Sequence, residues 1–574
     1  MQICKKIIVF LFVLTPFYLL AQSTYLNQGS KDYHFIDRLE IKQQNNTDLN
    51  FSALKPYNRM FIIQEVSLID SVRLGLKDSV IELRLLKNQL GSFSKADEYN
   101  LRSLFMNNTE WGESYRHEFV SKHPVFHTFY KSKSNFFEIN NKDIFLAVNP
   151  VLQVQFGKES DNEKRLYINT RGVTIRGRIG GRIGFSSTLT DNQERGASFY
   201  QQKVESLRAV PGVGFYKLFK KDPSAFDYFD GRGYLTFSAT KFIDFQFGYD
   251  KNFIGNGFRS LFLSDWGNSY LFAKINTRIW KFNYQNLFME LMPQFKKEGD
   301  VLLKRKYSAM HHLSMNVTKW LNVGLFEGVM FGRKDHFDFQ YLNPVIFYRH
   351  IEGTIGSPDN AVAGMDFKAN VKHRFQFYGQ FLMDEFILSQ VRNNPTSWVN
   401  KFGFQFGGKY IDAFGVKNLD LQIEMNRVRP FTYSHFDTIN NITHYNQPLA
   451  HPLGANFQEW IGILRYQPLP KLNIYARAIF YYQGLDTANA NFGGNIFKSY
   501  STRLTGEGFK VGSGNKATCL NGVLQASYEL RQNLFLEAGV QYRKYQLATG
   551  MNSPASTTFW AGFRFNMFRR EFDF

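Results

Sequence analysis

Polar and apolar residues alternate along many short segments in the last three-quarters of the chain. The segment from Asn418 to Met425 alternates strictly, and 533–543 and 558–567 repeat the pattern less strictly. Successive side chains of a β-strand point to opposite faces. Each segment therefore predicts a strand with one apolar face and one polar face.

Alternation and turn signals together predict about eighteen such strands, all after residue 143. The predicted strands lie at 144–156, 165–178, 181–190, 232–239, 243–250, 269–278, 281–292, 311–318, 321–332, 364–373, 375–385, 400–411, 418–428, 456–467, 470–483, 519–530, 533–545 and 556–568.

The links between these strands alternate in length. Links such as Gly180-Gly181 and Trp280-Lys281 are short, whereas 191–231 and 484–518 are long. Outer-membrane barrels have tight periplasmic turns and longer outside loops. An even strand number also places both barrel ends on one side, which predicts a periplasmic C-terminus at Phe572-Asp573-Phe574. The pattern thus predicts an all-β fold, an outer-membrane antiparallel barrel.

Composition supports this interpretation. Aromatic residues make up 17% of the chain, with 60 Phe, and barrels carry aromatic girdles at both membrane interfaces. The mean hydropathy of −0.33 is compatible with a barrel, because alternation hides the lipid face from an average. No stretch of about 18 apolar residues follows the N-terminus, so no helical span is predicted. A secreted array of β-sandwiches is the alternative.

The first 22 residues have the pattern of a secretory signal peptide. Lys5 and Lys6 precede an apolar core from Ile7 to Leu14, and Ala21 precedes the expected cut. A retained membrane anchor is the alternative. Cys519 would then be the single cysteine of the mature chain, which excludes an internal disulfide and a lipid-bearing N-terminal cysteine.

Residues 23–143 lack sustained alternation and form a predicted periplasmic, partly helical region ahead of the barrel at 144–574. Ser94 is a good N-cap, with Asp97 at the third position of the predicted helix that follows. The segment from Ser67 to Leu90 has a partly helical apolar pattern.

The formal charge of +20 falls to +18 without Lys5 and Lys6. Such an excess favours anionic partners. Nucleic acid does not fit an exported protein, so acidic surface polysaccharide and outer-membrane lipid phosphates are the expected partners. A solvated, non-specific positive surface is the alternative.

Several segments spread over most of the mature chain form a distinctive combination: Asp37–Glu40, Gly255–Leu261, Leu263–Asp265, Tyr341–Pro344, Gly356–Asn360, Arg427–His435 and Pro448–Phe457. Together they resemble the Wzi-like capsule assembly family, and within it the gliding-motility RemB branch of Bacteroidota. It implies an outer-membrane barrel with a helical periplasmic piece that helps to hold capsular polysaccharide and is lectin-like rather than catalytic. The RemB branch is linked to surface gliding, which would use the same ability to hold or contact polysaccharide. Motility or secretion machinery is a further expected partner.

The long loop at 429–455 concentrates residue types that suit acidic sugars. Arginine pairs with carboxylates through a fixed fork, and aromatic rings stack on the apolar faces of sugars. The alternative is a loop folded inward, whose polar groups satisfy one another. In a second loop, Arg259 and Asp265 are close enough to form an ion pair. The candidate polysaccharide-binding residues are Arg429, Tyr433, His435, His451 and Arg259.

Other candidate chemistry is weaker. His311 and His312 are neighbours on a strand and cannot easily share a metal, and Asp384 and Glu385 would face apart. No phosphate loop, zinc spacing or nucleophile elbow stands out. We therefore expect that the protein is not an enzyme and that it binds no metal and no cofactor. Two rival functions stay open. One is a porin-like channel lined by Asp420, Gln422 and Glu424, and the other is a structural component of a motility or secretion assembly.

Overall fold

The computed structural model describes residues 23–74, 93–112, 117–160, 162–293, 302–344, 347–356, 359–385, 388–550 and 555–574. The predicted signal peptide lies outside the described residues. So does the part of the predicted helical segment beyond Leu74.

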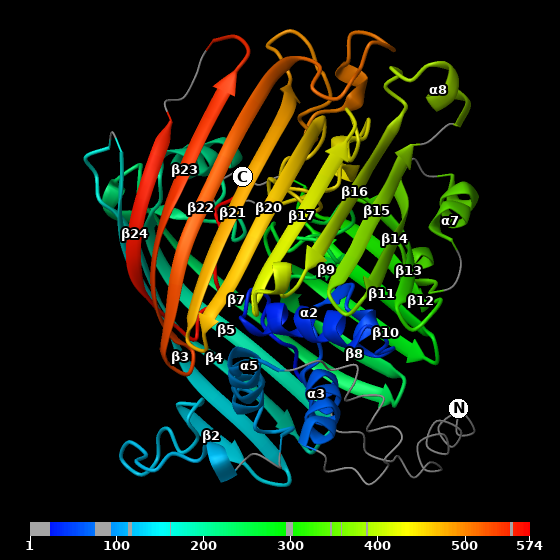
Figure 1. The fold of residues 1–574 in the computed structure, drawn as a ribbon. Coiled ribbons are helices and arrows are strands. Elements are labelled where there is room, and N and C mark those ends of the chain that lie inside the picture. The colour runs from blue at the N-terminus through cyan, green and yellow to red at the C-terminus, as the bar shows by residue number, and fades with distance from the viewer. Residues whose placement is uncertain are drawn as a thin grey trace, which may run out of the picture.

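Eighteen long antiparallel strands form a closed barrel, and each predicted strand coincides with one of them (Figure 1). Strand β24 pairs with β3 and closes the cylinder. The barrel strands are β3 (Ile144–Glu159), β4 (Leu166–Ile179), β5 (Ile183–Arg195), β7 (Phe226–Thr240), β8 (Ile243–Asp250), β10 (Tyr270–Ile279), β11 (Phe282–Leu291), β12 (Lys306–Asn316), β13 (Leu321–Phe331), β14 (Asn360–Val371), β15 (Phe375–Glu385), β16 (Lys401–Tyr410), β17 (Leu419–Val428), β20 (Phe457–Leu469), β21 (Leu472–Leu485), β22 (Asn515–Arg531), β23 (Leu534–Leu547) and β24 (Ser556–Phe565).

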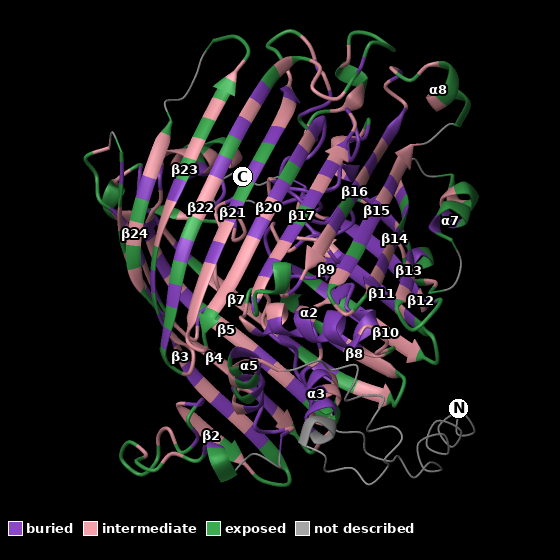
Figure 2. Cartoon of the chain, in the orientation of Figure 1, coloured by how far each residue is buried: buried purple, intermediate pink, exposed green. Residues whose placement is uncertain are grey.

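Buried and more exposed residues alternate along most strands of the barrel wall (Figure 2). The large side chains exposed on the wall are apolar, and many of the buried ones are polar. On β17, Ile423 is 70% exposed, whereas Gln422 and Glu424 are buried inside the lumen. Phe406 and Phe247 are likewise exposed on the outer face. Such an arrangement is stable only where lipid covers the outer wall. The protein is therefore an outer-membrane barrel.

The two ends of the barrel differ as predicted. The links between β7 and β8, β14 and β15, and β20 and β21 are tight turns, whereas the links at the opposite end are long. The end with tight turns is the periplasmic end, and the long loops are extracellular. None of the described helices is long and apolar enough to cross a membrane.

The region before the barrel is helical, as expected. It contains α2 (Asp32–Gln43), the 3-10 helix η1 (Leu49–Phe51), α3 (Arg59–Leu74) and α5 (Lys95–Met106). The predicted cap of α5 is confirmed: the Ser94 hydroxyl accepts from the Asp97 backbone N–H at 3.0 Å, and the Asp97 carboxylate accepts from the Ser94 N–H at 3.1 Å. These helices share a buried apolar core.

Part of this region lies inside the barrel rather than below it. Strand β1 (Leu54–Lys55) pairs with β9 (Phe253–Ile254), a short strand after β8. The backbone N–H of Tyr25 donates to the Tyr234 hydroxyl on the inner face of β7 at 2.8 Å. The segment from residue 23 to about 58 therefore fills the periplasmic mouth, a location that the prediction of a periplasmic region did not include.

Charged side chains of α2 dock this helix onto the inner wall of the barrel. They belong to the Asp37–Glu40 segment, and their partners lie on β14, β16, β17 and the turn after β16. The ion pairs are Asp37 with Lys409 at 2.7 Å, Glu40 with Lys368 at 2.6 Å, and Arg38 with Asp420, with Asp412 at 3.0 Å and with Asp97 of α5 at 3.2 Å.

The C-terminal tail corrects the prediction of a periplasmic terminus. Strand β24 ends at Phe565, and the remaining residues turn back into the lumen. Asp573 accepts from the Arg259 guanidinium at 2.9 Å, and the Phe574 ring packs against Tyr200 and Trp266. The terminal aromatic, Phe574, is buried. It lies near the extracellular end of the lumen, since its partner Tyr200 belongs to the extracellular helix α6 (Ser198–Leu207).

The extracellular loops carry the remaining short elements. They are β6 (Lys217–Leu218), η3 (Phe219–Lys221), η4 (Phe339–Leu342), α7 (Tyr348–Ile355), α8 (Leu388–Asn393), η6 (Thr438–Asn440), β18 (Thr443–His444), β19 (Gln447–Pro448) and η7 (Tyr500–Thr502). Two further short elements, β2 (Phe137–Asn140) beside β3 and η5 (Ala413–Gly415), lie at the periplasmic end.

Candidate functional site

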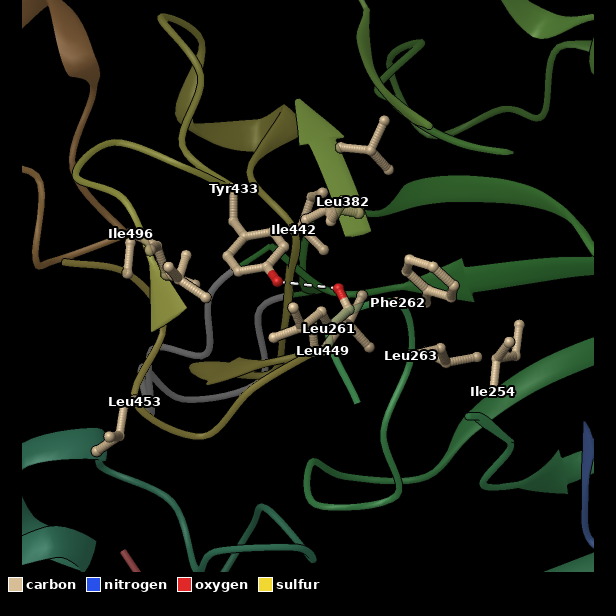
Figure 3. Close-up of a cluster of buried hydrophobic side chains, with 14 of the residues drawn as sticks. Ile254, Leu261, Phe262, Leu263, Leu382, Tyr433, Ile442, Leu449, Leu453 and Ile496 are labelled. Atoms are coloured by element: carbon tan, nitrogen blue, oxygen red, sulfur yellow. Dashed lines mark hydrogen bonds between the residues drawn. The ribbon is translucent and has the colours of Figure 1, made fainter. Parts of the chain in front are cut away.

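The loop between β17 and β20 folds into the top of the lumen, as the alternative interpretation of this loop expected. Tyr433 is 1% exposed, and its hydroxyl donates to the Leu261 carbonyl at 2.9 Å within an apolar cluster (Figure 3). Ile442 and Leu449 of the same loop belong to this cluster. The loop is therefore part of the core of the protein.

Four predicted binding residues are buried. Arg259, Tyr433, His435 and His451 are at most 6% exposed. The expected ion pair of Arg259 with Asp265 is not formed: Arg259 pairs with Glu459 at 3.2 Å and with Asp573 of the tail. His451 meets the same carboxylate of Glu459 at 2.8 Å. These side chains join the loop, the wall and the tail, and their contact with sugar stays a prediction.

Arg429 ties three extracellular loops together. Its Nε donates to the Asn400 carbonyl at 2.7 Å, and its Nη2 lies 3.3 Å from the Phe509 carbonyl and 3.4 Å from the Ser397 carbonyl. These acceptors lie on the loops after β15 and after β21. A half-buried guanidinium that bonds only to carbonyl oxygens keeps its positive charge. Arg429 thus positions the loops at the extracellular face.

His435 lies at the edge of an aromatic and cationic platform that these loops build. The rings of Trp398 and Tyr500 are 4.8 Å apart, and the His435 ring is 5.9 Å from that of Tyr500. The Arg503 guanidinium stacks 3.6 Å from the centre of the Trp398 ring. Phe436, which is 45% exposed, is 6.4 Å from Tyr500. We name Trp398, His435, Phe436, Tyr500 and Arg503 the platform.

The platform presents groups that a polar, flat ligand can use. Trp398, Tyr500 and Arg503 are half-buried, and the Arg503 Nε is buried without a hydrogen-bond partner among the described residues. An unpaired buried N–H is costly, so a bound acceptor would be favourable there. Below the platform, Lys401 Nζ lies 4.4 Å from the Tyr500 ring centre.

Sequence reasoning found His435 and Arg429 but missed Trp398, Tyr500 and Arg503. These three residues lie in two other long loops, each more than 30 residues from Arg429. Trp398 precedes β16, and Tyr500 and Arg503 follow β21. Aromatic and arginine residues in neighbouring long loops were the available signal, but loop order alone does not say which of them meet.

The remaining candidate pairs have structural roles. His312 points into the lumen and meets Asp366 at 2.7 Å, whereas His311 points outward and bonds to Tyr348. Neighbouring histidines on opposite faces agree with the prediction that they do not share a metal. The described residues contain no group of three or more metal-ligating side chains.

Asp384 and Glu385 do not face apart, contrary to expectation. A register shift after Met383 brings both carboxylates to Lys401, with Nζ 3.5 Å from Asp384 and 3.2 Å from Glu385. Asp384 also accepts from the Tyr433 N–H at 2.6 Å. Two carboxylates that share one lysine form an ion-pair cluster beneath the platform.

Acidification is expected to loosen the inward-folded loop. Burial, reinforced by Lys401, lowers the pKa of His435, and burial lowers the pKa of His444 to about 4. Both pKa values lie below the ordinary 6.5, so the folded loop excludes protons that the unfolded chain binds. Stability is therefore lost as pH falls from about 6.5 towards 4, by about 2 kcal/mol for His444 at pH 5.

The measurement is the unfolding free energy of wild type and His444→Gln at pH 7 and pH 5. The difference between the two pH values should shrink in the variant, because carboxylates that titrate in both proteins cancel. An equal pH dependence in both would contradict neutral burial of His444.

The lumen is filled from both ends. Segment 23–58 enters from the periplasm, the 429–456 loop enters from outside, and the tail runs between them. They surround a central cavity of about 470 Å³. Fold and site thus define an outer-membrane β-barrel with a filled lumen and an aromatic, cationic extracellular face.

No family model matches the chain, and no curated protein matches its sequence. Among solved structures, the chain is similar to Wzi of Escherichia coli, a carbohydrate-binding β-barrel involved in group 1 capsule assembly. The TM-score is 0.56 at 10% identity, and the match covers 95% of this chain and 100% of Wzi. OprD of Pseudomonas aeruginosa aligns with a TM-score of 0.41 and 10% identity over 73% of this chain and 92% of OprD. The likeness to Wzi shows the outer-membrane barrel fold.

Proposed function

We propose that the protein binds and organises acidic surface polysaccharide, capsular or exopolysaccharide, at its extracellular loops. The arrangement of Trp398, Tyr500 and Arg503 within the platform is the observation that carries this proposal. Flat indole and phenol rings stack on the apolar faces of sugars. The guanidinium of Arg503 gives one bond from Nη1 to the Tyr500 carbonyl at 3.0 Å and offers its remaining donors to a carboxylate. The carbohydrate binding stated for Wzi supports the same class of ligand.

The filled lumen supports a role at the surface. Asp420, Gln422 and Glu424, which a porin would present to water, are bonded instead. Asp420 meets Arg38 and His34, Gln422 accepts from Arg465 at 3.1 Å, and Glu424 accepts from the backbone N–H of Phe258 at 2.6 Å. These bonds oppose free passage of solutes.

Arg429, Tyr433 and His451 act here by holding the loops in place, and Arg259 by holding the tail. A repeating polymer then gains affinity from many weak contacts, which multivalency amplifies. Polysaccharide held in this way would also serve surface gliding, which the resemblance to the gliding-motility branch supports.

Replacing Trp398 and Tyr500 together by alanine is expected to weaken polysaccharide binding about tenfold, because stacking of each ring contributes about 0.5–1.5 kcal/mol. The measurement is equilibrium binding of acidic capsular polysaccharide to the detergent-folded protein over a salt series. Salt should weaken the part of binding that depends on Arg503.

Phe414→Ala is the matched control, since Phe414 is an aromatic 78% exposed at the periplasmic end. It should leave binding unchanged. Undiminished binding by a folded Trp398→Ala/Tyr500→Ala variant would remove the platform from the proposal.

A further inference from the structure

One sector of the outer wall is covered by protein. The loop between β13 and β14 folds down outside the barrel, with α7 against the wall (Figure 1). Beneath it lies an apolar cluster that is separate from the lumen. Its buried members are Phe288, Tyr307, Ala309, Val329, Phe331, Tyr341, Tyr348 and Ile351.

The covered wall carries a polar row at mid-height. Asn286, His311 and Glu327 are register neighbours on β11, β12 and β13, and they share the outer face because His312 points inward. Polar side chains at this depth need partners, since hydrocarbon offers none. The loop supplies them: Tyr348 bonds to His311, and the Arg349 N–H donates to Glu327 at 3.2 Å.

The outer surface of this loop is itself apolar. Phe339 is 78% exposed, Phe347 73% and Leu342 41%. Lower on the same strands, Leu325 and Met365 expose the ordinary lipid-facing wall. The loop therefore begins where the lower apolar wall ends, in the extracellular half of the membrane, and three large apolar side chains there are stable among acyl chains.

Each of three carboxylates of this loop has a partner, although Asp335 is itself exposed. The Asp335 carboxylate accepts from the Arg305 N–H at 2.6 Å, Asp359 pairs with Arg333 at 2.6 Å, and Glu352 pairs with Arg349 at 2.8 Å. Lys304 and Lys334 flank this network and are exposed. In the described part of the chain, neither lysine makes a hydrogen bond or an ion pair.

We propose that this patch, formed by Lys304, Lys334, Phe339, Leu342 and Phe347, binds a phosphorylated glycolipid of the outer leaflet. The three apolar side chains lie among the acyl chains, and the two ammonium groups meet the phosphates. The site lies on the wall, away from the platform, so it is independent of polysaccharide binding. It anchors the loop that shields the polar row.

The test is native mass spectrometry of the full-length mature barrel, released from detergent after incubation with diphosphorylated lipid A. The wild type should retain the lipid. Lys304→Gln/Lys334→Gln should retain about 25-fold less, because each lysine near an anionic lipid surface contributes roughly a factor of five. Phe339→Ser/Phe347→Ser should also lose the lipid, and dephosphorylated lipid A should bind wild type as weakly as the lysine variant binds the intact lipid.

Lys498→Gln/Lys510→Gln is the control for the loss of two exposed positive charges elsewhere, on the loop between β21 and β22, where Lys498 pairs with Asp486 at 3.2 Å. It should retain lipid like wild type. All substituted side chains are exposed, so the barrel should stay folded, which heat-dependent gel mobility checks. Equal lipid retention by wild type and both patch variants overturns the proposal. A dimer that dissociates in the variants also overturns it, because the patch then binds a second copy.

Discussion

Deleting the tail from Met567 to Phe574 is expected to make the barrel conduct ions. The tail occupies the lumen, where Glu571 pairs with Arg477, and Asp573 with Arg259. Strand β24 ends before the tail, at Phe565, so closure against β3 remains possible without it. Conductance in planar bilayers should rise from a quiet baseline to repeated openings.

The same deletion should lower the unfolding free energy by about 3–5 kcal/mol for each buried pair that it breaks. Arg259 keeps Glu459, so the larger losses are expected at Arg477, which is left without its tail carboxylates, and at the buried Glu194, which loses Arg570.

Asp573→Asn is the control that keeps the length of the tail. It removes one charge and should reduce stability while the bilayer trace stays quiet. A truncated barrel that folds and is as quiet as wild type would show that segment 23–58 and the inward loop close the lumen without the tail.

The strands of this fold were predictable because their signal is local. Alternation on β17 reflects the burial of Asp420, Gln422 and Glu424 and the exposure of Ile423, and it requires no knowledge of the neighbouring strands. Loop lengths then gave the orientation of the barrel. The capping box at Ser94 and Asp97 is equally local, which is why α5 was predicted at the correct residue.

The filling of the lumen was not predictable in the same way. Arg259 was expected to pair with Asp265, six residues away, yet its partners Glu459 and Asp573 lie 200 and 314 residues further along the chain. The sequence pattern of a polar inner face is the same whether that face contacts water or other parts of the chain. The charged residues of α2 and of the tail are therefore predicted to be solvated unless their partners on the wall are known.

The candidate site was half predicted for the same reason. Arg429 and His435 stood out because one loop concentrates unusual residue types. Trp398, Tyr500 and Arg503 come together because the loops after β15 and β21 bond to each other and because Arg429 ties both to its own loop. Burial of Tyr433 and His451 follows from the inward fold, which apolar residues such as Ile442 and Leu449 drive.

Replacing Arg38 by alanine is expected to free α2 from the periplasmic mouth. The Arg38 side chain is 4% exposed and faces three carboxylates, Asp97, Asp412 and Asp420. Without it, these buried charges keep only Lys42 and His34 nearby, and the loss of a buried partner costs about 3–5 kcal/mol. Amide hydrogen exchange in α2 should accelerate by a factor of roughly 100 or more, because 1.4 kcal/mol corresponds to a factor of ten.

Arg102→Ala provides the comparison, since Arg102 is 62% exposed and pairs with a half-exposed Glu118 at 2.6 Å on the same helical region. An exposed pair contributes about 0–1 kcal/mol, so exchange in α2 should hardly change. If α2 exchanged equally slowly in both variants, its protection would rest on the apolar core that Phe35, Ile36 and Leu39 form with α3 and α5 rather than on the ion pairs. Fast exchange in Arg38→Ala alone would instead show that ion pairs with the wall hold α2 in the periplasmic mouth of the barrel.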